Sequence, residues 1–235
     1  MIIIQARTNS TRLPSKVLLE LCGTTVLEVM FKRLEVLKEH IIVATTDDGS
    51  EEPIVEICKK HSIACFRGDE KNVLKRFADC AKKFSKNKEE SIVRLTSDCP
   101  LIDADIVKNV INFFDENSYD YVSNVEKRTF PRGMDCEVFS LSSLLDANEK
   151  AKTSYDKEHV TPYIKAHSNI GSFESSIDNS NFRLTLDTIE DFQVIKLIYN
   201  ELNCSTDFSY KKLIDLLKEK PHLSKLNQNV KQKTV

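Results

Sequence analysis

The sequence predicts an α/β protein with a mostly parallel central sheet and helices on both faces. Apolar runs alternate with helical patterns four times over about a hundred residues, which is typical of strands joined by right-handed crossovers. The first run, Ile2-Ile3-Ile4, is β-branched and continuous and therefore indicates a strand buried on both faces. Polar clusters follow three of the strands, at the edge where open α/β sheets bind their ligands.

The first part of the chain accounts for most of this sheet. Apolar residues from Val26 to Leu37 recur at helical spacing, and Thr25 with Glu28 forms a possible capping box at the start of that helix. Leu74, Phe77 and Ala81 share one face of a later helix. In chain order the expected elements are strand 2–4, helix 25–37, strand 41–45, helix 51–61, strand 64–66, helix 73–84 and strand 92–95.

The second part of the chain is less regular. Asp103 is expected to cap a helix, and Pro162 is tolerable in the first turn of a helix that starts at 156–162. We expect a single domain over residues 1–220, followed by a loose, polar, lysine-rich tail over 221–235. The further expected elements are helix 103–117, strands 119–124 and 134–139, helix 142–151, strand 182–186, and helices 190–202 and 208–217.

The composition excludes several classes of protein. The chain has 235 residues, of which 40% are hydrophobic and 30% charged, and its net charge is −2 (34 basic against 36 acidic residues). This balance creates no field that attracts nucleic acid or anionic membranes, and no apolar run approaches the roughly 20 residues of a membrane span. The first apolar stretch lacks a basic leader and a cleavage site, so we do not expect it to be a signal peptide.

Cysteine and glycine usage narrows the chemistry. The seven cysteines are an odd number, widely scattered and without a C-x-x-C pair. A disulfide framework or a zinc ribbon would need clustered spacing, so we expect reduced, mostly buried thiols in a cytoplasmic protein. With only five glycines, a glycine-rich phosphate loop cannot form, and anion binding must depend on cationic side chains.

Three cations follow the first strand and lie among serine and threonine hydroxyls. Arg7, Arg12 and Lys16 are placed where the strand ends, which suits a phosphorylated ligand. We interpret this loop as the triphosphate-binding element of a nucleotidyltransferase. The alternative is a solvated surface loop that happens to be basic.

Two aspartates are candidate metal ligands. Asp98 and Asp187 each follow an expected strand directly, and carboxylates at the ends of two strands can converge on one cation. Mg²⁺ prefers one or two carboxylates together with water and phosphate oxygens. The alternative is that each aspartate caps the following turn or helix.

Other polar residues are weaker candidates. His159 lies next to Glu158, but neighbouring residues on a helix point apart, and a lone histidine near a helix start is more often structural. Arg132 lies in a loop, where it is equally plausible as an anion ligand or as an exposed ion pair.

Five ordered motifs, covering about residues 2–200, resemble the CTP-using sugar nucleotidyltransferases. The resemblance is nearest to the spore-coat polysaccharide biosynthesis (SpsF-type) branch and more distant to the synthetases of CMP-sialic acid and CMP-KDO. The matching segments are 3–16, 68–77, 93–103, 131–139 with 158–164, and 183–191.

The resemblance implies a Rossmann-like nucleotide-diphospho-sugar transferase fold and Mg²⁺-dependent transfer of CMP from CTP. It also implies roles for individual residues. Asp98 and Asp187 would hold the metal, while Arg12 and Lys16 would act with them in catalysis. The nucleotide would contact Ala6, Arg7, Ser10, Arg12, Lys16, Thr96 and Asp98, with Thr96 near the base, and the second substrate would contact Arg132, Asp135, Glu137, Glu158 and His159.

The sequence departs from the family at two positions of the first loop. Asn9 and Ser15 stand where the family usually has glycine. Asn tolerates a left-handed backbone better than most residues, so the turn can be kept at position 9. Ser15 is harder to accommodate if a positive φ is required, and the loop is then slightly reshaped.

The expected reaction is attack of a substrate oxygen on the α-phosphorus of CTP, with pyrophosphate leaving. The acceptor is a sugar, a sugar acid, or a sugar or polyol phosphate; a hydroxyl acceptor needs a base, for which Glu158, His159 and Asp135 are all open. Two rival functions are a glycosyltransferase that uses a nucleotide-sugar donor and a non-catalytic nucleotide-binding subunit. Relatives commonly pair, so we expect a homodimer, with residues 121–139 as the region to search for its contact.

Overall fold

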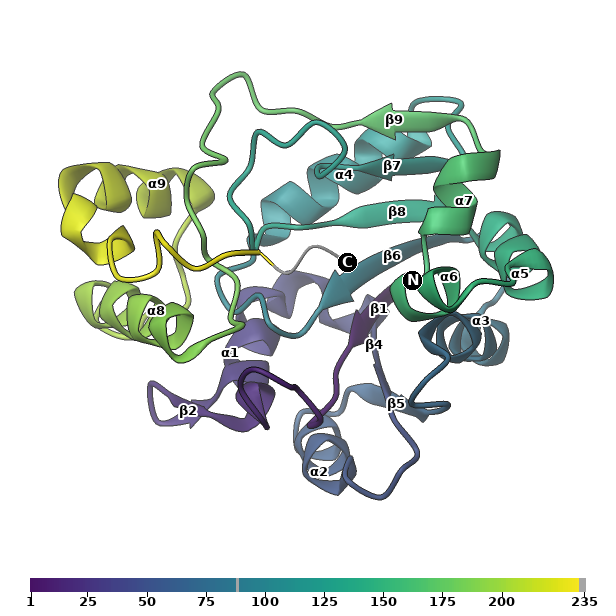
Figure 1. Ribbon diagram of the computed structural model, residues 1–235, viewed down its shortest axis with the longest axis horizontal. Helices are drawn as coiled ribbons and strands as arrows, with labels where there is room; N and C mark the ends of the chain where they lie inside the picture. The colour runs from purple at the N-terminus through teal and green to yellow at the C-terminus, as the bar shows by residue number, and fades with distance from the viewer. Residues whose placement is uncertain (88, 233–235) are drawn as a thin grey trace.

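The computed structural model describes residues 1–87 and 89–232. Its centre is a seven-stranded sheet with the order β5-β4-β1-β6-β8-β7-β9 (Figure 1). The neighbours β5, β4, β1 and β6 run parallel, β8 is antiparallel to both β6 and β7, and β9 is parallel to β7. The expected, mostly parallel sheet is therefore confirmed. The strands are β1 Ile2–Gln5, β4 Ile41–Thr45, β5 Ala64–Arg67, β6 Ser91–Thr96, β7 Tyr121–Ser123, β8 Glu137–Ser140 and β9 Ile170–Ser172.

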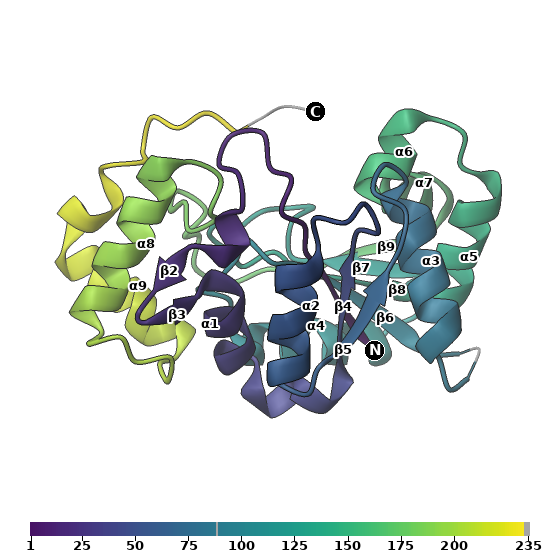
Figure 2. The same ribbon diagram turned by 90° about the horizontal axis from the view of Figure 1, so that it is seen from below.

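Helices cover both faces of this sheet. Along β1, Ile2 and Ile4 join one hydrophobic cluster and Ile3 joins the other, as the alternation of a strand requires. Figure 2 shows α1, α8 and α9 on one side of the molecule and α3, α5, α6 and α7 on the other. The helices are α1 Val26–Arg33, α2 Glu52–Lys60, α3 Val73–Phe84, α4 Ala104–Asp115, α5 Leu141–Lys150, α6 Ser154–His159, α7 Pro162–His167, α8 Ile189–Glu201 and α9 Tyr210–Glu219.

The predicted helix signals have local causes in the structure. Thr25 and Glu28 form the capping box of α1, and the Asp103 side chain accepts two backbone N–H bonds at the start of α4. Most boundaries lie within a few residues of those expected. The helix expected over 25–37 is shorter, because α1 ends at Arg33 and the chain continues as the 3₁₀ turns Glu35–His40. None of the described helices is long and apolar enough to cross a membrane.

Several expectations were wrong in detail. Residues 182–186 form no strand. Their one strand-like pairing is an isolated parallel bridge between Arg183 and Arg132, which lies in an irregular loop. The helix expected from 156–162 is two short helices, α6 and α7, separated by a turn at Val160. The short hairpin β2 (Glu20–Leu21) and β3 (Thr24–Thr25) and the edge strand β9 were not predicted, because none of them has enough length for a period-2 pattern.

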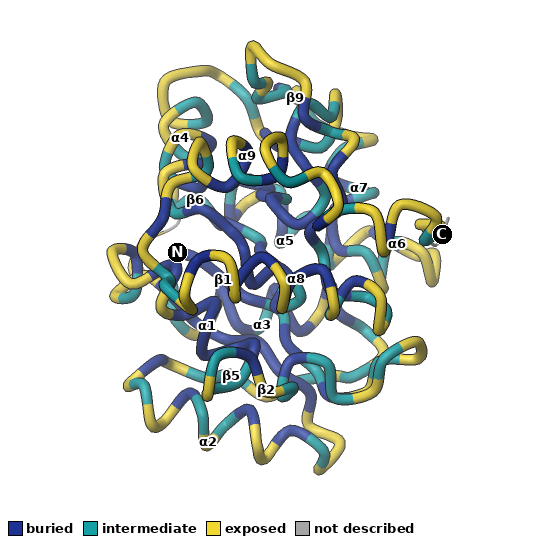
Figure 3. Tube along the Cα trace, turned by 90° about the vertical axis from the view of Figure 1, so that its left-hand side faces the viewer, coloured by how far each residue is buried: buried dark blue, intermediate teal, exposed yellow. Residues whose placement is uncertain are grey.

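The C-terminal segment is packed, contrary to the loose tail expected over 221–235. A 3₁₀ turn at Pro221–Ser224 buries Leu223, and Asn227 is 1% exposed (burial along the chain is shown in Figure 3). Residues 233–235 of the expected tail lie outside the described part of the chain. The sequence shows no periodicity here because the segment is held by side-chain hydrogen bonds as well as by apolar burial.

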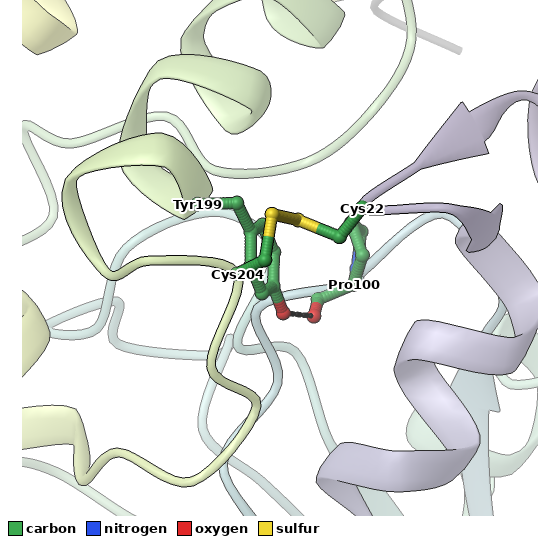
Figure 4. Close-up of a disulfide and its surroundings, with 4 residues drawn as sticks. All are labelled: Cys22, Pro100, Tyr199 and Cys204. Carbon is green, nitrogen blue, oxygen red and sulfur yellow. Dashed lines mark hydrogen bonds between the residues drawn. A yellow bond between two sulfur atoms is a disulfide. The ribbon is translucent and has the colours of Figure 1, made fainter.

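One disulfide contradicts the expectation of seven reduced thiols. Cys22, in the turn between β2 and β3, is bonded to Cys204, just after α8, across a sequence separation of 182 (Figure 4). Nearby, the Tyr199 hydroxyl donates to the Pro100 carbonyl at 2.7 Å. The spacing rule failed because only the fold brings the two cysteines together. The other five cysteines are free.

Candidate active site

The loop after β1 connects the polar clusters that follow three parallel strands. The Asn9 amide donates to Asp48, after β4, and to Glu70, after β5, while the Thr8 hydroxyl bonds to Ser50 at 2.6 Å. Ser15 adopts the left-handed conformation, with φ 53°, and its N–H donates to the Thr8 carbonyl. The positive φ that the family's usual glycine suggests is therefore present at Ser15 but not at Asn9, where the side chain instead anchors the loop.

Lys16 and Arg12 meet the two candidate metal ligands. The Lys16 ammonium lies 2.6 Å from Asp98 Oδ2 and 2.9 Å from Asp187 Oδ1. The Arg12 guanidinium lies 2.9 Å from Asp187 Oδ2. The carboxylates, which are 89 residues apart in sequence (187 − 98), thus face the same cation across one cleft.

The charges of this cluster stabilise one another. Burial opposes protonation of Lys16, but Asp98 and Asp187 outweigh that cost and raise its pKa. Burial also opposes ionisation of Asp98, yet its ion pair with Lys16 lowers the pKa of the carboxyl. The Lys16–Asp98 pair is therefore charged on both sides at neutral pH.

A second layer of contacts holds Asp187. Arg183 donates to Asp187 Oδ2 at 3.0 Å and forms a two-pronged bond with Asp191, at 2.8 and 2.9 Å. Asp191 is fully buried and also accepts the backbone N–H of Asp187 and Thr188. Sequence reasoning gave neither Arg183 nor Asp191 a role, although both lie in a quoted motif and Asp191 stands three residues after the cap Thr188.

The cluster lines a cleft of about 340 Å³. Gln5 and Thr96 at the ends of β1 and β6 form its floor, and Glu158 and His159 contribute from α6. Ala6, expected near the nucleotide, is 1% exposed, so its backbone is what it can offer. Of the expected site residues, those that line this cleft are Arg7, Ser10, Arg12, Lys16, Thr96, Asp98, Asp135, Glu158, His159 and Asp187.

A larger chamber of about 560 Å³ adjoins this cleft and shares Thr96, Asp135 and His159 with it. Its wall includes Lys165 from α7 and a buried ion pair between Arg94 and Glu137. This size is within the range of small-molecule sites.

Within this chamber, not every expected residue has free polar atoms. Glu137 already accepts hydrogen bonds from the Tyr121 and Thr161 hydroxyls, at 2.8 and 2.7 Å, in addition to its ion pair with Arg94. Its oxygens are therefore engaged within the protein. Asp135 is bound by both terminal nitrogens of Arg128, at 2.6 and 3.0 Å.

A strained turn presents Glu158 and His159 to the cleft. Val160 has φ 70° and ψ −54°, and the Thr161 N–H donates to the His159 carbonyl at 2.8 Å, which defines a γ-turn of the rare, strained kind. Such backbone in a β-branched residue persists only where its surroundings enforce it. Val160 is fully buried, so packing holds the turn that separates α6 from α7.

Arg132 lines neither the cleft nor the larger chamber. It lines a third hollow, of about 280 Å³, together with Arg183, Asn227 and Gln232. The neighbouring Gly133 has φ 100°, and a Cβ added there would lie 2.5 Å from the Leu184 carbonyl carbon. The Pro131-Arg132-Gly133 motif therefore allows close approach to the segment that leads to Asp187.

The residues fit a magnesium ion. The Lys16 ammonium acts as a stand-in that marks a point within 2.9 Å of an oxygen from each carboxylate. Two carboxylate oxygens are a suitable share of a Mg²⁺ shell that is completed by water and phosphate. Among the described residues no group of three or more His, Cys, Asp or Glu could hold a metal without such help.

Comparison with known proteins identifies the family. The model of the cytidylyltransferase family matches residues 1–234. The spore coat polysaccharide biosynthesis protein SpsF of Bacillus subtilis is 33% identical over 93% of this chain and 94% of its own.

Solved structures agree with this assignment. A cytidylyltransferase from Leptospira borgpetersenii is 36% identical, covers 99% of this chain with 98% of its own, and gives a TM-score of 0.90. A CMP:2-keto-3-deoxy-manno-octonic acid synthetase complexed with CTP gives a TM-score of 0.64 over 85% of this chain and 98% of its own; at 15% identity this likeness concerns the fold alone. The protein described here is a nucleotidyltransferase that belongs to the cytidylyltransferase family.

Proposed function

We propose that this enzyme transfers CMP from CTP to a sugar, a sugar acid or a sugar phosphate in a magnesium-dependent reaction that releases pyrophosphate. One observation carries the proposal: Lys16 bridges Asp98 and Asp187 in a cleft that Arg12 also lines. Cations beside two carboxylates suit a magnesium–triphosphate, because the metal and the phosphates then neutralise the opposite charges of the site.

In this mechanism Asp98 and Asp187 would hold the metal. Bound Mg²⁺ would supply charge neutralisation at the phosphate oxygens. Because Mg²⁺ binds its ligands at about 2.0–2.1 Å, it cannot share the space of the Lys16 ammonium. When magnesium nucleotide binds, Lys16 would therefore turn from the carboxylates to the phosphates and neutralise the leaving pyrophosphate.

The remaining residues of the first loop bind and orient the nucleotide. Arg12 serves as a planar fork and Lys16 as a point charge on phosphate oxygens. Arg7, Ser10 and the carbonyl of Ala6, whose N–H already donates to the Ala44 carbonyl, would contribute further contacts, and Thr96 is the proposed contact with the base. Such transfer needs alignment and electrostatic stabilisation more than covalent catalysis.

The larger chamber is the proposed acceptor site. It adjoins the nucleotide cleft at Thr96, Asp135 and His159, so an acceptor bound there would lie next to the nucleotide. A sugar hydroxyl must lose a proton, and the candidate bases are Glu158, His159 and Asp135, of which Asp135 would act while paired with Arg128. The oxygens of Glu137 are already hydrogen-bonded within the protein, and Arg132 lines another hollow. We therefore propose that these two residues stabilise the fold and do not bind the substrate.

The biological setting follows from the reaction and from one relative. SpsF is a spore coat polysaccharide biosynthesis protein, and an activated sugar of this kind would serve the assembly of a surface polysaccharide. We place the reaction in the cytoplasm, where CTP is made.

We also propose a homodimer. The expected contact region, 121–139, contains the interior strands β7 and β8, so the open edge strand β9, where Ile170 is 41% exposed, is the better candidate surface.

A pyrophosphate-release screen tests the function. Four nucleoside triphosphates are each combined with sugar acids, sugar phosphates and polyol phosphates, with magnesium or with EDTA. We expect release with CTP and one acceptor class, and none with EDTA. Release of a nucleotide from a preformed nucleotide-sugar, with no pyrophosphate from CTP, would contradict the proposal. Light scattering after size exclusion gives the oligomeric state separately.

A further inference from the structure

The C-terminal segment runs back across the molecule to the candidate active site. After α9, Leu223 is buried, and Asn227 donates to the Arg183 carbonyl at 3.0 Å and to Asp191 Oδ1 at 2.8 Å. The chain then continues to Gln232, and in Figure 1 this segment runs from α9 toward the middle of the molecule. Gln232 lines both the nucleotide cleft and the hollow that contains Arg132.

Gln232 makes a specific contact at this point. Its side-chain oxygen accepts from Arg183 Nη1 at 2.6 Å. The other donors of Arg183 are directed elsewhere, since Nε and Nη2 bond to Asp191 and Nη2 also bonds to Asp187. The guanidinium is thus bound along three directions, by a buried carboxylate, by the candidate metal ligand and by the C-terminal segment.

This arrangement limits how Asp187 can turn. Its Oδ2 lies between Arg183 at 3.0 Å and Arg12 at 2.9 Å, which leaves Oδ1 directed toward Lys16. If Lys16 moves to the phosphates, Arg12, which lines the same cleft, would be drawn to them as well. Arg183, held in place by Asp191 and Gln232, is then the contact that keeps Oδ2 fixed and Oδ1 aimed at the metal.

We propose that Gln232 is a positioning residue: through Arg183 it orients Asp187 for magnesium nucleotide, so that the C-terminal segment is a working part of the active site. This inference rests on the proposed function. Loss of one such hydrogen bond should weaken the binding of magnesium nucleotide about three- to tenfold. The effect belongs to the metal-bound state, because only there does Asp187 lose its contact with Lys16.

The test compares Gln232→Ala with Lys231→Ala, its exposed neighbour, as the matched control. Calorimetry measures the affinity for CTP with and without magnesium, kinetics give kcat and KM at varied magnesium, and thermal unfolding gives Tm. We expect Gln232→Ala to weaken magnesium–CTP binding and to raise the magnesium needed for half-maximal rate, each about three- to tenfold, with CTP alone and Tm changed little. Gln232→Glu, which keeps an accepting oxygen, should recover part of the loss in magnesium requirement.

Three results would overturn the inference. They are wild-type magnesium dependence in Gln232→Ala, an equal change in Lys231→Ala, and a loss explained entirely by a lower Tm. Failure of the proposed function looks different: the wild-type enzyme would then release no pyrophosphate from CTP with any acceptor. The calorimetric comparison with magnesium–CTP would still judge Gln232.

Discussion

Replacing Lys16 by alanine separates the two roles that we assign to this side chain. In the absence of ligand, the Lys16 ammonium neutralises Asp98 and Asp187, whose side chains are only 22% and 14% exposed. Without it, Asp98 loses its ion pair, while Asp187 keeps its contacts with Arg12 and Arg183. Removing one partner of a buried pair costs about 3–5 kcal/mol, and partial exposure reduces this here to about 2–4 kcal/mol. For a chain of this size that corresponds to a fall in Tm of roughly 4–16 °C.

Magnesium should reverse that loss. In Lys16→Ala the ion can occupy the space between the carboxylates without displacing an ammonium, so magnesium alone should raise Tm more in the variant than in the wild type. The affinity for CTP should instead fall in Lys16→Ala. Loss of one cation from a triphosphate site costs about 2–3 kcal/mol, or roughly 30- to 150-fold in the Kd for CTP.

The assay pairs thermal unfolding over a magnesium titration with calorimetric CTP binding. Lys71→Ala, an exposed lysine outside the cleft, is the control for general loss of positive charge. The reasoning is refuted if magnesium raises Tm equally in wild type and Lys16→Ala, or if the variant binds CTP with wild-type affinity.

Three further predictions concern single positions. Asp98→Ala should nearly abolish turnover, and activity within about threefold of wild type in a pyrophosphate assay would exclude Asp98 as a metal ligand. Cys204→Ser, or reduction of the wild type, should lower Tm by roughly 4–16 °C, because a bond that closes so long a loop with Cys22 typically contributes about 2–4 kcal/mol; equal Tm values with and without reductant would show that the bond does not form in solution. Burial would raise the pKa of Glu28, but hydrogen bonds from Lys60, Thr24 and His61 lower it below its ordinary value of 4.5. Ionised Glu28 therefore stabilises the fold at pH values above 4.5, and this contribution is lost as the pH falls below 4.5. Denaturant unfolding of Glu28→Gln should therefore show a loss of about 1–3 kcal/mol at pH 7 that shrinks below pH 4.5, and a loss independent of pH would contradict this account.

Much of the fold could be predicted because its signals are local. The run Ile41–Thr45 is β-branched except for Ala44 and is buried throughout, and it forms β4 with the boundaries expected. The position of the first loop followed from sheet geometry, since the carboxyl ends of parallel strands meet at one edge. The same rule predicts that Lys16 lies near Asp98, and the two side chains are 2.6 Å apart.

The remainder depends on contacts that no local pattern encodes. Residues 182–186 alternate between apolar and polar, but they lie against the irregular turn at Gly133, so no strand forms. Cys22 and Cys204 meet only because α8 ends beside the β2–β3 hairpin. Asn227 is buried by hydrogen bonds to Arg183 and Asp191, and a polar residue in a lysine-rich tail carries no sign of this.

The location of the metal tests the central claim most directly. Mn²⁺ can replace Mg²⁺ and scatters X-rays anomalously, so crystals grown with CTP and Mn²⁺ would give an anomalous difference peak at the ion. We predict one peak within about 2.0–2.3 Å of an oxygen from each of Asp98 and Asp187, with the Lys16 ammonium moved onto the triphosphate. A peak bound by other residues, or CTP held with Lys16 still between the two aspartates, would contradict the account.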